Sequence, residues 1–415
     1  MSANPGIAAR SGTDKRASFL ARMCRKALQH RLRGLQHGKL RVRDPLGNWS
    51  VGEDGELDAE LDVFDLHFYE DATLEGSLGV ARSWSEGIWN TPDLTTLLRL
   101  MVRNMNKIDA MEGGAATVMN WFARFRHLGN RNSRNGSARN IHEHYDLGND
   151  LFATFLDDSM TYSSGIYLTE DSSLADAQFE KLDRICRKLA LKPEHHIVEI
   201  GTGWGSFAIH AAKHYGCKVT TTTISEEQLK LAQQRVLDAG LQDLIELKLT
   251  DYRDLEGQYD RLVSIEMIEA VGHQYLPVYF EQCAALLKPE GSMVIQAINM
   301  PDQRYDQYLK STDFIQAVVF PGSCCAALTA IMDAMKSHTD LKLVHLEDIG
   351  RDYARTLADW RHRFRAAIND VYDLGYSQAF ARMWVYYLSY CEAGFAERYT
   401  STTQLMFEKP RCGVA

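Results

Sequence analysis

No stretch of the 415-residue sequence approaches the apolar run of about 18 residues that a membrane-spanning helix needs. The N-terminus also lacks the uninterrupted apolar core of a secretory signal. The eight cysteines are scattered, with Cys324 and Cys325 as the one close pair, and no Cys or His cluster has metal-ligand spacing. These absences argue against an integral membrane protein and against a metal site. They predict a cytoplasmic protein with reduced cysteines.

Acidic residues are almost missing from the first part of the chain. Residues 1–43 hold eleven Lys or Arg and one acid, Asp14, although the whole chain has a net charge of −9. Five apolar side chains of this basic arm are predicted to share one helical face: Phe19, Leu20, Met23, Ala27 and Leu28. A membrane-surface helix within residues 15–33 would explain this pattern, and a helix that packs on its own domain explains it equally well. Nucleic-acid binding is less favoured, because the rest of the chain is acidic and carries no such motif.

The segment 106–140 is also basic. Between Arg124 and Arg139 it contains five arginines and no acid. A solvated loop would explain this composition, and so would a linker that lies on an anionic membrane surface. We therefore hypothesise a protein that is peripheral at the inner membrane surface. We leave open whether two copies form a homodimer.

Two folded domains are predicted on either side of this linker. After an arm of residues 1–34, the chain from 35 to 105 shows strand patterns at 39–42 and 61–68 and a helix pattern from 94 to 105. Turn-rich segments separate these patterns, which is typical of a small α+β domain.

The chain from residue 141 to 415 alternates between strand and helix patterns. Strands are expected at 197–200, 219–224, 245–249, 260–266 and 292–298, and helices before Pro193 and from Ser206, Ser225 and Pro277. This alternation predicts an α/β fold with a Rossmann-like, doubly wound and mainly parallel sheet. A ligand would then bind at the carboxyl ends of the strands.

The clearest functional signal is the stretch Ile197–Gly205. Alternating glycines, with Gly201 and Gly203 in the turn, force a tight connection from a buried strand into a helix. A dinucleotide fingerprint has G-x-G-x-x-G and an acid near the end of the next strand. Here the loop is G-x-G-x-G with Glu199 ahead of it, so we expect a cationic ligand. The pattern resembles the S-adenosylmethionine (SAM) loop of Rossmann-like methyltransferases.

Three further features have two explanations each. Ser225 and Gln228 fit a helix capping box, which we weigh evenly against a cofactor role. Asp251 and Tyr252 follow the third strand, where they would hold an adenine or form a plain strand-end turn. The aromatic-rich C-terminal tail is predicted to form core or an apolar substrate tunnel.

Seven short segments together form a specific signature: His144–Asp150, Met160–Ser163, Glu199–Gly205, Thr223–Gln228, Asp251–Asp254, Asp260–Ile265 and Phe320–Gly322. They resemble the cyclopropane fatty acid synthase family, which includes the mycolic acid cyclopropane synthases. The match runs from about residue 141 to 409. A weaker match joins residues 35–105 to the small N-terminal domain of the phospholipid-acting branch.

The resemblance implies SAM as the cofactor and unsaturated acyl chains of membrane phospholipids as the substrate. The sulfonium methyl is attacked by a cis double bond, and a base then removes a proton from the carbocation. The residues at the family's cofactor positions are Tyr162, Ser163, Glu199, Gly201, Gly203, Gly205, Thr223, Gln228, Asp251 and Tyr252.

The resemblance also implies a base, which in this family is a bicarbonate ion held by a cysteine, a glutamate, a histidine and a tyrosine. The glutamate and the tyrosine correspond to Glu269 and Tyr353. The cysteine and histidine positions hold Ser164 and Gln296, and Ala270 replaces the histidine that follows the glutamate. We therefore expect a weaker grip on bicarbonate, with Glu269 as an alternative base. The expected products are cyclopropane or methyl- or methylene-branched acyl chains.

Two other functions stay open from the sequence. One is a methyltransferase of the same fold that acts on nitrogen or oxygen of a small molecule, and the other is a non-catalytic protein that binds lipid or SAM. The apolar tail and the basic arm favour the lipid enzyme over the first. The retained Glu269 and cofactor segments favour catalysis over the second.

Overall fold

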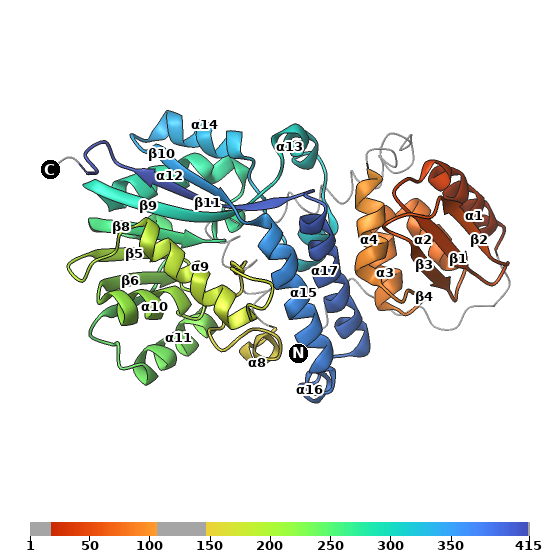
Figure 1. Ribbon diagram of the computed structural model, residues 1–415, viewed down its shortest axis with the longest axis horizontal. Helices are drawn as coiled ribbons and strands as arrows, with labels where there is room; N and C mark the ends of the chain where they lie inside the picture. The colour runs from red at the N-terminus through yellow and green to blue at the C-terminus, as the bar shows by residue number, and fades with distance from the viewer. Residues whose placement is uncertain (1–17, 106–146, 414–415) are drawn as a thin grey trace.

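The computed structural model of the chain describes residues 18–105 and 147–413 (Figure 1). A smaller N-terminal unit, red to orange in Figure 1, lies beside a larger unit with a seven-stranded sheet. Two long helices of the C-terminal part, α15 (Gly350–Ala366) and α17 (Gln378–Ala396), stand between the two. The predicted linker 106–140 and the first part of the arm lie outside the described residues.

The smaller unit has a four-stranded sheet in the order β2-β1-β3-β4. Its elements are α1 (Phe19–Arg31), β1 (Lys39–Arg43), β2 (Trp49–Gly52), β3 (Ala59–Val63), α2 (His67–Leu74), α3 (Gly76–Ser85), β4 (Trp89–Asn90) and α4 (Leu94–Arg103). The helix α4 begins where predicted, because Asp93 caps it by accepting the Thr96 N–H. The predicted strand 61–68 is wrong in its second half. Asp65 accepts the His67 N–H at 3.0 Å, and the chain turns there into α2.

The basic helix α1 does pack on its own unit, but with a different face from the predicted one. Ala21 and Cys24 are buried, and α1 lies against α2. Leu28 is partly buried beside them. The other members of the predicted apolar face, Phe19, Leu20, Met23 and Ala27, are exposed. The helix therefore has a buried apolar face and an exposed apolar face.

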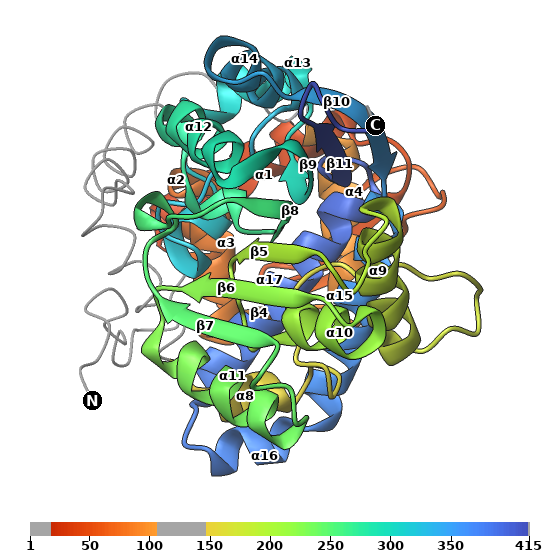
Figure 2. The ribbon, with the colours of Figure 1, turned by 90° about the vertical axis from the view of Figure 1, so that its left-hand side faces the viewer.

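The larger unit confirms the predicted doubly wound α/β fold. Its sheet has the order β10-β11-β9-β8-β5-β6-β7, and the run β8-β5-β6-β7 is visible in Figure 2. The strands are β5 (His196–Ile200), β6 (Lys218–Thr223), β7 (Ile245–Leu249), β8 (Tyr259–Ile265), β9 (Leu287–Asn299), β10 (Lys342–Asp348) and β11 (Ser401–Glu408). The helices besides α15 and α17 are α8 (Asn149–Ala153), α9 (Leu174–Lys188), α10 (Ser206–Tyr215), α11 (Glu226–Asp238), α12 (Leu276–Leu286), α13 (Asp302–Tyr308), α14 (Leu328–His338) and α16 (Ile368–Asp373).

The five strands predicted from the sequence pair in parallel, and two strands that were not predicted complete the sheet. Strand β11 pairs antiparallel with β9 on one side and with β10 on the other. The parallel strands all end at one edge of the sheet. This edge is where the fold places a ligand.

The smaller unit is fastened to α17 by packing and by charged groups. The indole N–H of Trp84 donates to the Arg382 carbonyl at 2.8 Å, and the Arg382 guanidinium lies over the Trp84 ring. The buried Glu397 carboxylate accepts hydrogen bonds from Arg99 and Arg103 of α4. One hydrophobic cluster runs without a break from α1 to α17.

We expect Glu397→Gln to lower the free energy of unfolding by about 1–3 kcal/mol, because two arginines would lose a charged acceptor. Urea unfolding followed by tryptophan fluorescence measures this change. Glu290→Gln is the matched control, since the ion pair of Glu290 with Arg411 is exposed and should contribute less than about 1 kcal/mol. Equal effects of the two substitutions would contradict the fastening role of Glu397.

Candidate active site

The glycine loop lies at the carboxyl end of β5, as predicted. Gly201, Gly203 and Gly205 all have positive φ angles, of 100°, 53° and 87°. A Cβ added to Gly203 would meet no atom within 4 Å, whereas one on Gly201 would lie 3.2 Å from the side chain of Met267. The backbone thus passes an open space at Gly203 and touches the β8 end at Gly201. Such a loop fits a ligand that approaches the backbone closely.

Glu199 lies in the sheet just before this loop and is 2 % exposed. Its carboxylate accepts the Thr221 hydroxyl at 2.6 Å. Burial raises the pKa of Glu199 to about 8, although the Thr221 hydrogen bond and the nearby Lys181 charge oppose this. That Glu199 binds a cationic group of the ligand stays a prediction.

After β6, one of the two hydrogen bonds of the predicted capping box is present. The Ser225 hydroxyl accepts the Gln228 N–H at 3.2 Å and caps α11. The Gln228 side chain does not return to the Ser225 N–H. Its oxygen instead accepts the Thr223 hydroxyl at 2.8 Å, and the Ser225 N–H donates to that same hydroxyl. Thr223 and Gln228 therefore form a fixed polar pair beside the loop.

Asp251 and Tyr252 form the strand-end turn that was the structural alternative for this segment. The Asp251 carboxylate accepts the Arg253 guanidinium at 2.8 and 2.5 Å, and it caps the short turn that follows. The Tyr252 ring lies edge-on to Tyr279, with the centroids 5.5 Å apart. Contact with an adenine stays a prediction for both residues.

The Thr161–Ser164 segment is held between α9 and the C-terminal helices. The Tyr162 hydroxyl shares a hydrogen bond of 2.7 Å with Tyr387 of α17. The Tyr162 ring lies 5.2 Å from the Trp360 ring of α15. The Ser163 hydroxyl accepts the Lys181 ammonium at 2.8 Å, so this side chain points into α9.

Aromatic rings surround Tyr162 and close this part of the molecule. They belong to Phe152, Phe155, Phe320, Trp360, Trp384 and Tyr387. Most of these rings are buried in the cluster shared with the smaller unit, while Tyr162 and Phe320 keep some accessible surface. The C-terminal aromatics are thus core residues, and a wall of rings faces the glycine-loop end of the sheet.

Three of the four predicted catalytic residues converge on one carboxylate, that of Glu266. The Ser164 backbone N–H donates to its Oε1 at 3.0 Å, and the Gln296 amide donates to the same oxygen at 2.8 Å. The Tyr353 hydroxyl donates to Oε2 at 2.7 Å. Glu266 has a φ of 48°, which is rare for a residue other than glycine. Burial raises the pKa of Glu266, and the three donors oppose that rise.

Glu269, the fourth predicted catalytic residue, lies one turn further along the chain. Its Oε1 accepts the Ile298 N–H of β9 at 2.5 Å, and its Oε2 is buried without a hydrogen-bond partner among the described residues. Burial raises the pKa of Glu269 to about 8, and the neighbouring Glu266 charge adds to this. The catalytic role of Glu269 stays a prediction. The structure places a second carboxylate, that of Glu266, among the predicted catalytic residues.

The motif pattern also gave no reason to single out Lys181, which is fully buried. Burial lowers its pKa to about 8, while the charges of Glu266, Asp157 and Glu199 oppose this. The sequence did contain one sign that Lys181 is buried. Lys181 follows Ala177 by four residues, so both lie on the same face of α9, which is buried. A lysine on an apolar face requires a carboxylate nearby.

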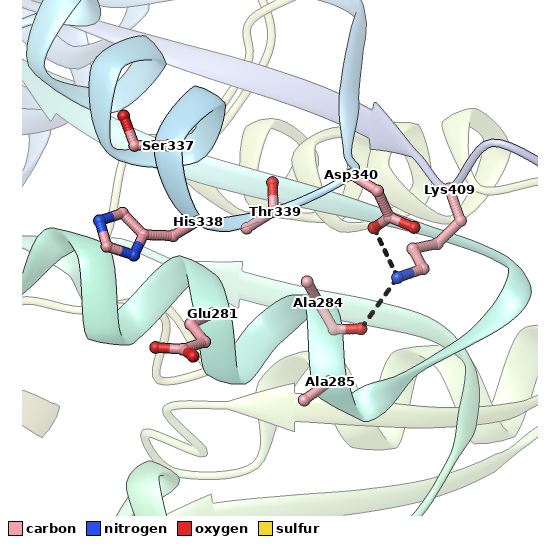
Figure 3. Close-up of a pocket in the computed structure, with 8 residues that line it drawn as sticks. All are labelled: Glu281, Ala284, Ala285, Ser337, His338, Thr339, Asp340 and Lys409. Carbon is pink, nitrogen blue, oxygen red and sulfur yellow. Dashed lines mark hydrogen bonds and ion pairs between the residues drawn. The ribbon is translucent and has the colours of Figure 1, made fainter.

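An open depression lies at the opposite end of the sheet (Figure 3). It is lined by the ends of α12 and α14 and by Lys409, whose ammonium already contacts Asp340 and the Ala284 carbonyl. The strand β9 begins there. Because ligands of this fold bind at the carboxyl ends of the strands, we assign no function to the depression.

We expect Gly203→Val to abolish SAM binding, because the new side chain would fill the open space beside the loop. Gly240→Val is the matched control. Gly240 also has a positive φ, of 66°, and open space at its Cβ, but it lies beyond the far end of α11. Isothermal calorimetry should show loss of SAM binding in the first variant and normal affinity in the second. Normal affinity in a folded Gly203→Val protein would contradict this placement.

Comparisons with known proteins show the family of the chain. The family model described as "Mycolic acid cyclopropane synthetase" matches residues 132–405. The chain is 38 % identical over 340 residues to the tuberculostearic acid methyltransferase UfaA1 of Mycobacterium tuberculosis, covering 79 % of this chain and 78 % of the relative. It is 34 % identical over 364 residues to the cyclopropane-fatty-acyl-phospholipid synthase of Escherichia coli K12, covering 88 % and 91 %.

Solved structures lead to the same family. The mycolic acid cyclopropane synthase CmaA1, in complex with SAH and CTAB, matches with a TM-score of 0.62 and 26 % identity, over 66 % of this chain and 98 % of that one. The cyclopropane synthase MmaA2 of Mycobacterium tuberculosis matches with the same TM-score, identity and coverage. The chain thus belongs to the mycolic acid cyclopropane synthetase family and is a SAM-dependent methyltransferase.

Proposed function

We propose that this enzyme methylates the double bond of unsaturated fatty acyl chains in membrane phospholipids. The observation that carries the proposal is the cluster around Glu266, in which a carboxylate lies beside the glycine loop and a wall of aromatic rings. An alkene has no acidic proton to lose before methyl transfer. A base is needed only afterwards, when the carbocation must lose a proton.

When bound, SAM supplies an electrophilic methyl group on a sulfonium. The residues of the chain supply what the rest of the reaction needs. The rings of Tyr162, Trp360 and Phe320 exclude water, and their faces attract a developing cation. The Glu266 carboxylate is connected to these rings through Tyr353, whose ring lies 6.1 Å from the Trp360 ring. Glu266 and Glu269 offer oxygens for the proton.

The product depends on which proton is removed. Loss of a proton from the added methyl group closes a cyclopropane ring, as the C–H electrons form the third carbon–carbon bond. Loss from a neighbouring chain carbon leaves a methyl-branched alkene, and a prior hydride shift along the chain leads to a methylene branch. None of these products requires an oxidant or a reductant. A saturated methyl branch would require a separate hydride donor, so it is not proposed as a product of this chain alone.

The relatives support the lipid substrate. The Escherichia coli enzyme is named for a fatty-acyl-phospholipid, and the Mycobacterium tuberculosis enzyme for a fatty acid. A coclaurine N-methyltransferase matches at 16 % identity and a TM-score of 0.59, which shows the fold alone. No observation among the described residues favours the N- or O-methyltransferase or the non-catalytic alternative.

We expect cells that express the protein and grow on methionine with a trideuterated methyl group to accumulate labelled phospholipid acyl chains. Mass spectrometry of the fatty acids distinguishes the outcomes. A cyclopropane ring or a methylene branch retains two deuterons, because one is lost to the base, and a methyl-branched alkene retains all three. Cells that express Gly203→Val are the control. Label in a small amine or alcohol, with none in acyl chains, would contradict the proposed substrate.

The exposed face of α1 fits contact with the lipid surface. Phe19, Leu20 and Met23 are 80 %, 46 % and 54 % exposed, and Phe19, Met23 and Ala27 follow one another at helical spacing. Arg22 and Lys26 are exposed beside them. Across residues 18–105 and 147–413, no helix has the length and apolar character to cross a bilayer. We propose that α1 attaches the enzyme to the surface of an anionic membrane. The basic segment 124–139, predicted to assist, lies outside the described residues.

We expect the double substitution Phe19→Ser and Met23→Ser to weaken binding to anionic phospholipid vesicles about tenfold or more, because each side chain would lose apolar contact with lipid. The matched control replaces Leu168 and Leu237, which are 64 % and 59 % exposed on the larger unit, by serine. Co-sedimentation with vesicles measures binding, which should also weaken as salt rises. Equal loss in both double variants would remove α1 as the attachment site.

A further inference from the structure

We propose that Glu266 is the general base of the reaction and that its carboxylate fills the place of a free anion. The inference rests on the proposed function. It adds that Glu266 is the base and that the reaction does not require bicarbonate. The resemblance to the family assigned bicarbonate to the positions of Ser164, Gln296, Tyr353 and Glu269. In this structure the first three already bind a carboxylate of the chain itself.

The donors come from three separate parts of the fold. Ser164 follows the Tyr162 segment, Gln296 is in β9 and Tyr353 is in α15. The Gln296 amide is fixed in its orientation, because its oxygen accepts the Gln404 amide of β11 at 3.0 Å. Its nitrogen must therefore face Glu266. Gln404 thus acts as a positioning residue, and a preformed ring of donors surrounds one carboxylate.

The hydrogen bonds leave one oxygen more basic than the other. Oε1 accepts two donors, from Ser164 and Gln296, and Oε2 accepts one, from Tyr353. A carboxylate offers about four acceptor sites, so a lone pair remains on Oε2. In the proposed step this lone pair takes a proton from the methyl group or from a neighbouring chain carbon. The C–H electrons enter the new ring bond or the new double bond, and Glu266 becomes a neutral acid that returns its proton to solvent.

Glu266 is also placed where a base is needed. Met267, the next residue, touches the glycine loop at Gly201. Gln296 and Ser164 are fully buried, whereas Glu266 and Met267 keep some accessible surface. Some accessible surface is expected of a residue that borders a substrate site.

Glu269 is less suited to the same task. Its Oε1 is held by the Ile298 N–H, and it lacks the ring of donors that stabilises an anion. Burial and the neighbouring Glu266 charge raise the pKa of Glu269 to about 8, which favours its neutral form. A free anion beside Glu266 would be repelled by the Glu266 charge, and the three hydrogen-bond donors would already be occupied by Glu266.

The test uses the purified full-length enzyme, vesicles of unsaturated phospholipid and methyl-labelled SAM in buffers freed of carbon dioxide. The wild-type rate should not change when bicarbonate is added. Glu266→Gln should lose about 10²–10⁴-fold of product formation and keep its affinity for SAM in calorimetry. Glu266→Ala should be equally impaired, but added bicarbonate should restore part of its activity. Glu281→Gln, an exposed glutamate of α12, is the matched control with an unchanged rate.

A second measurement does not depend on turnover. In NMR with ¹³C-bicarbonate, Glu266→Ala should broaden the bicarbonate signal through binding at the vacated site, and the wild type should not. A wild-type rate that rises steeply with bicarbonate, or near-normal activity of Glu266→Gln, would overturn the inference while leaving the proposed function intact. If the wild type labels no lipid, the proposed function fails. The assignment of Glu266 as its base then falls with it, and equal bicarbonate binding by wild type and Glu266→Ala would separately overturn the statement that Glu266 fills the place of a free anion.

Discussion

Placing carboxylates inside the protein is the constraint on which the active-site end of the sheet depends. Glu199 lies near the end of β5, Glu266 and Glu269 follow the end of the adjacent parallel strand β8, and Lys181 lies among them. A charge buried there loses several kcal/mol of hydration, which hydrogen bonds and an opposite charge must offset, and burial accordingly raises the pKa of all three carboxyl groups. Thr221, Ser164, Gln296 and Tyr353 supply those hydrogen bonds. The polar residues around the site are therefore required for the carboxylates to be there at all.

The helices α15 and α17 join this constraint to the rest of the molecule. Tyr353 of α15 donates to Glu266, and Tyr387 of α17 holds the Tyr162 hydroxyl. The other side of α17 carries Arg382 and Glu397, which hold the smaller unit. The unit that exposes the apolar face of α1 is thus fixed relative to the site by the same helices that build it. Attachment through α1 would hold the active site at a set distance from the lipid surface.

The parallel part of the fold followed from periodicity, because its strands are short apolar runs between glycine turns. The strands β10 and β11 were both missed, and for β11 the reason is physical. Thr403 and Gln404 are polar yet buried in β11, where they bond to Asn299 and Gln296 of β9. Tertiary hydrogen bonds thus conceal the strand signal. The cofactor loop could be located from its glycines. Glu266 could not be recognised from a motif, although a carboxylate directly after the apolar end of β8 repeats the signal that drew attention to Glu199.

Glu266 explains how the neutral side chain of Gln296 can stand at a base-site position where the family resemblance implies a histidine. A free anion must be attracted from solution, which favours charged or strongly polarised partners such as a protonated histidine. A carboxylate attached to the backbone needs only to be oriented, since its binding step is intramolecular. A neutral donor such as the Gln296 amide is sufficient for that task, beside the backbone N–H of Ser164, which any residue at that position would supply. If Glu266 is the base, as proposed, the chain supplies the base itself, and Gln296 and the Ser164 N–H need only orient its carboxylate.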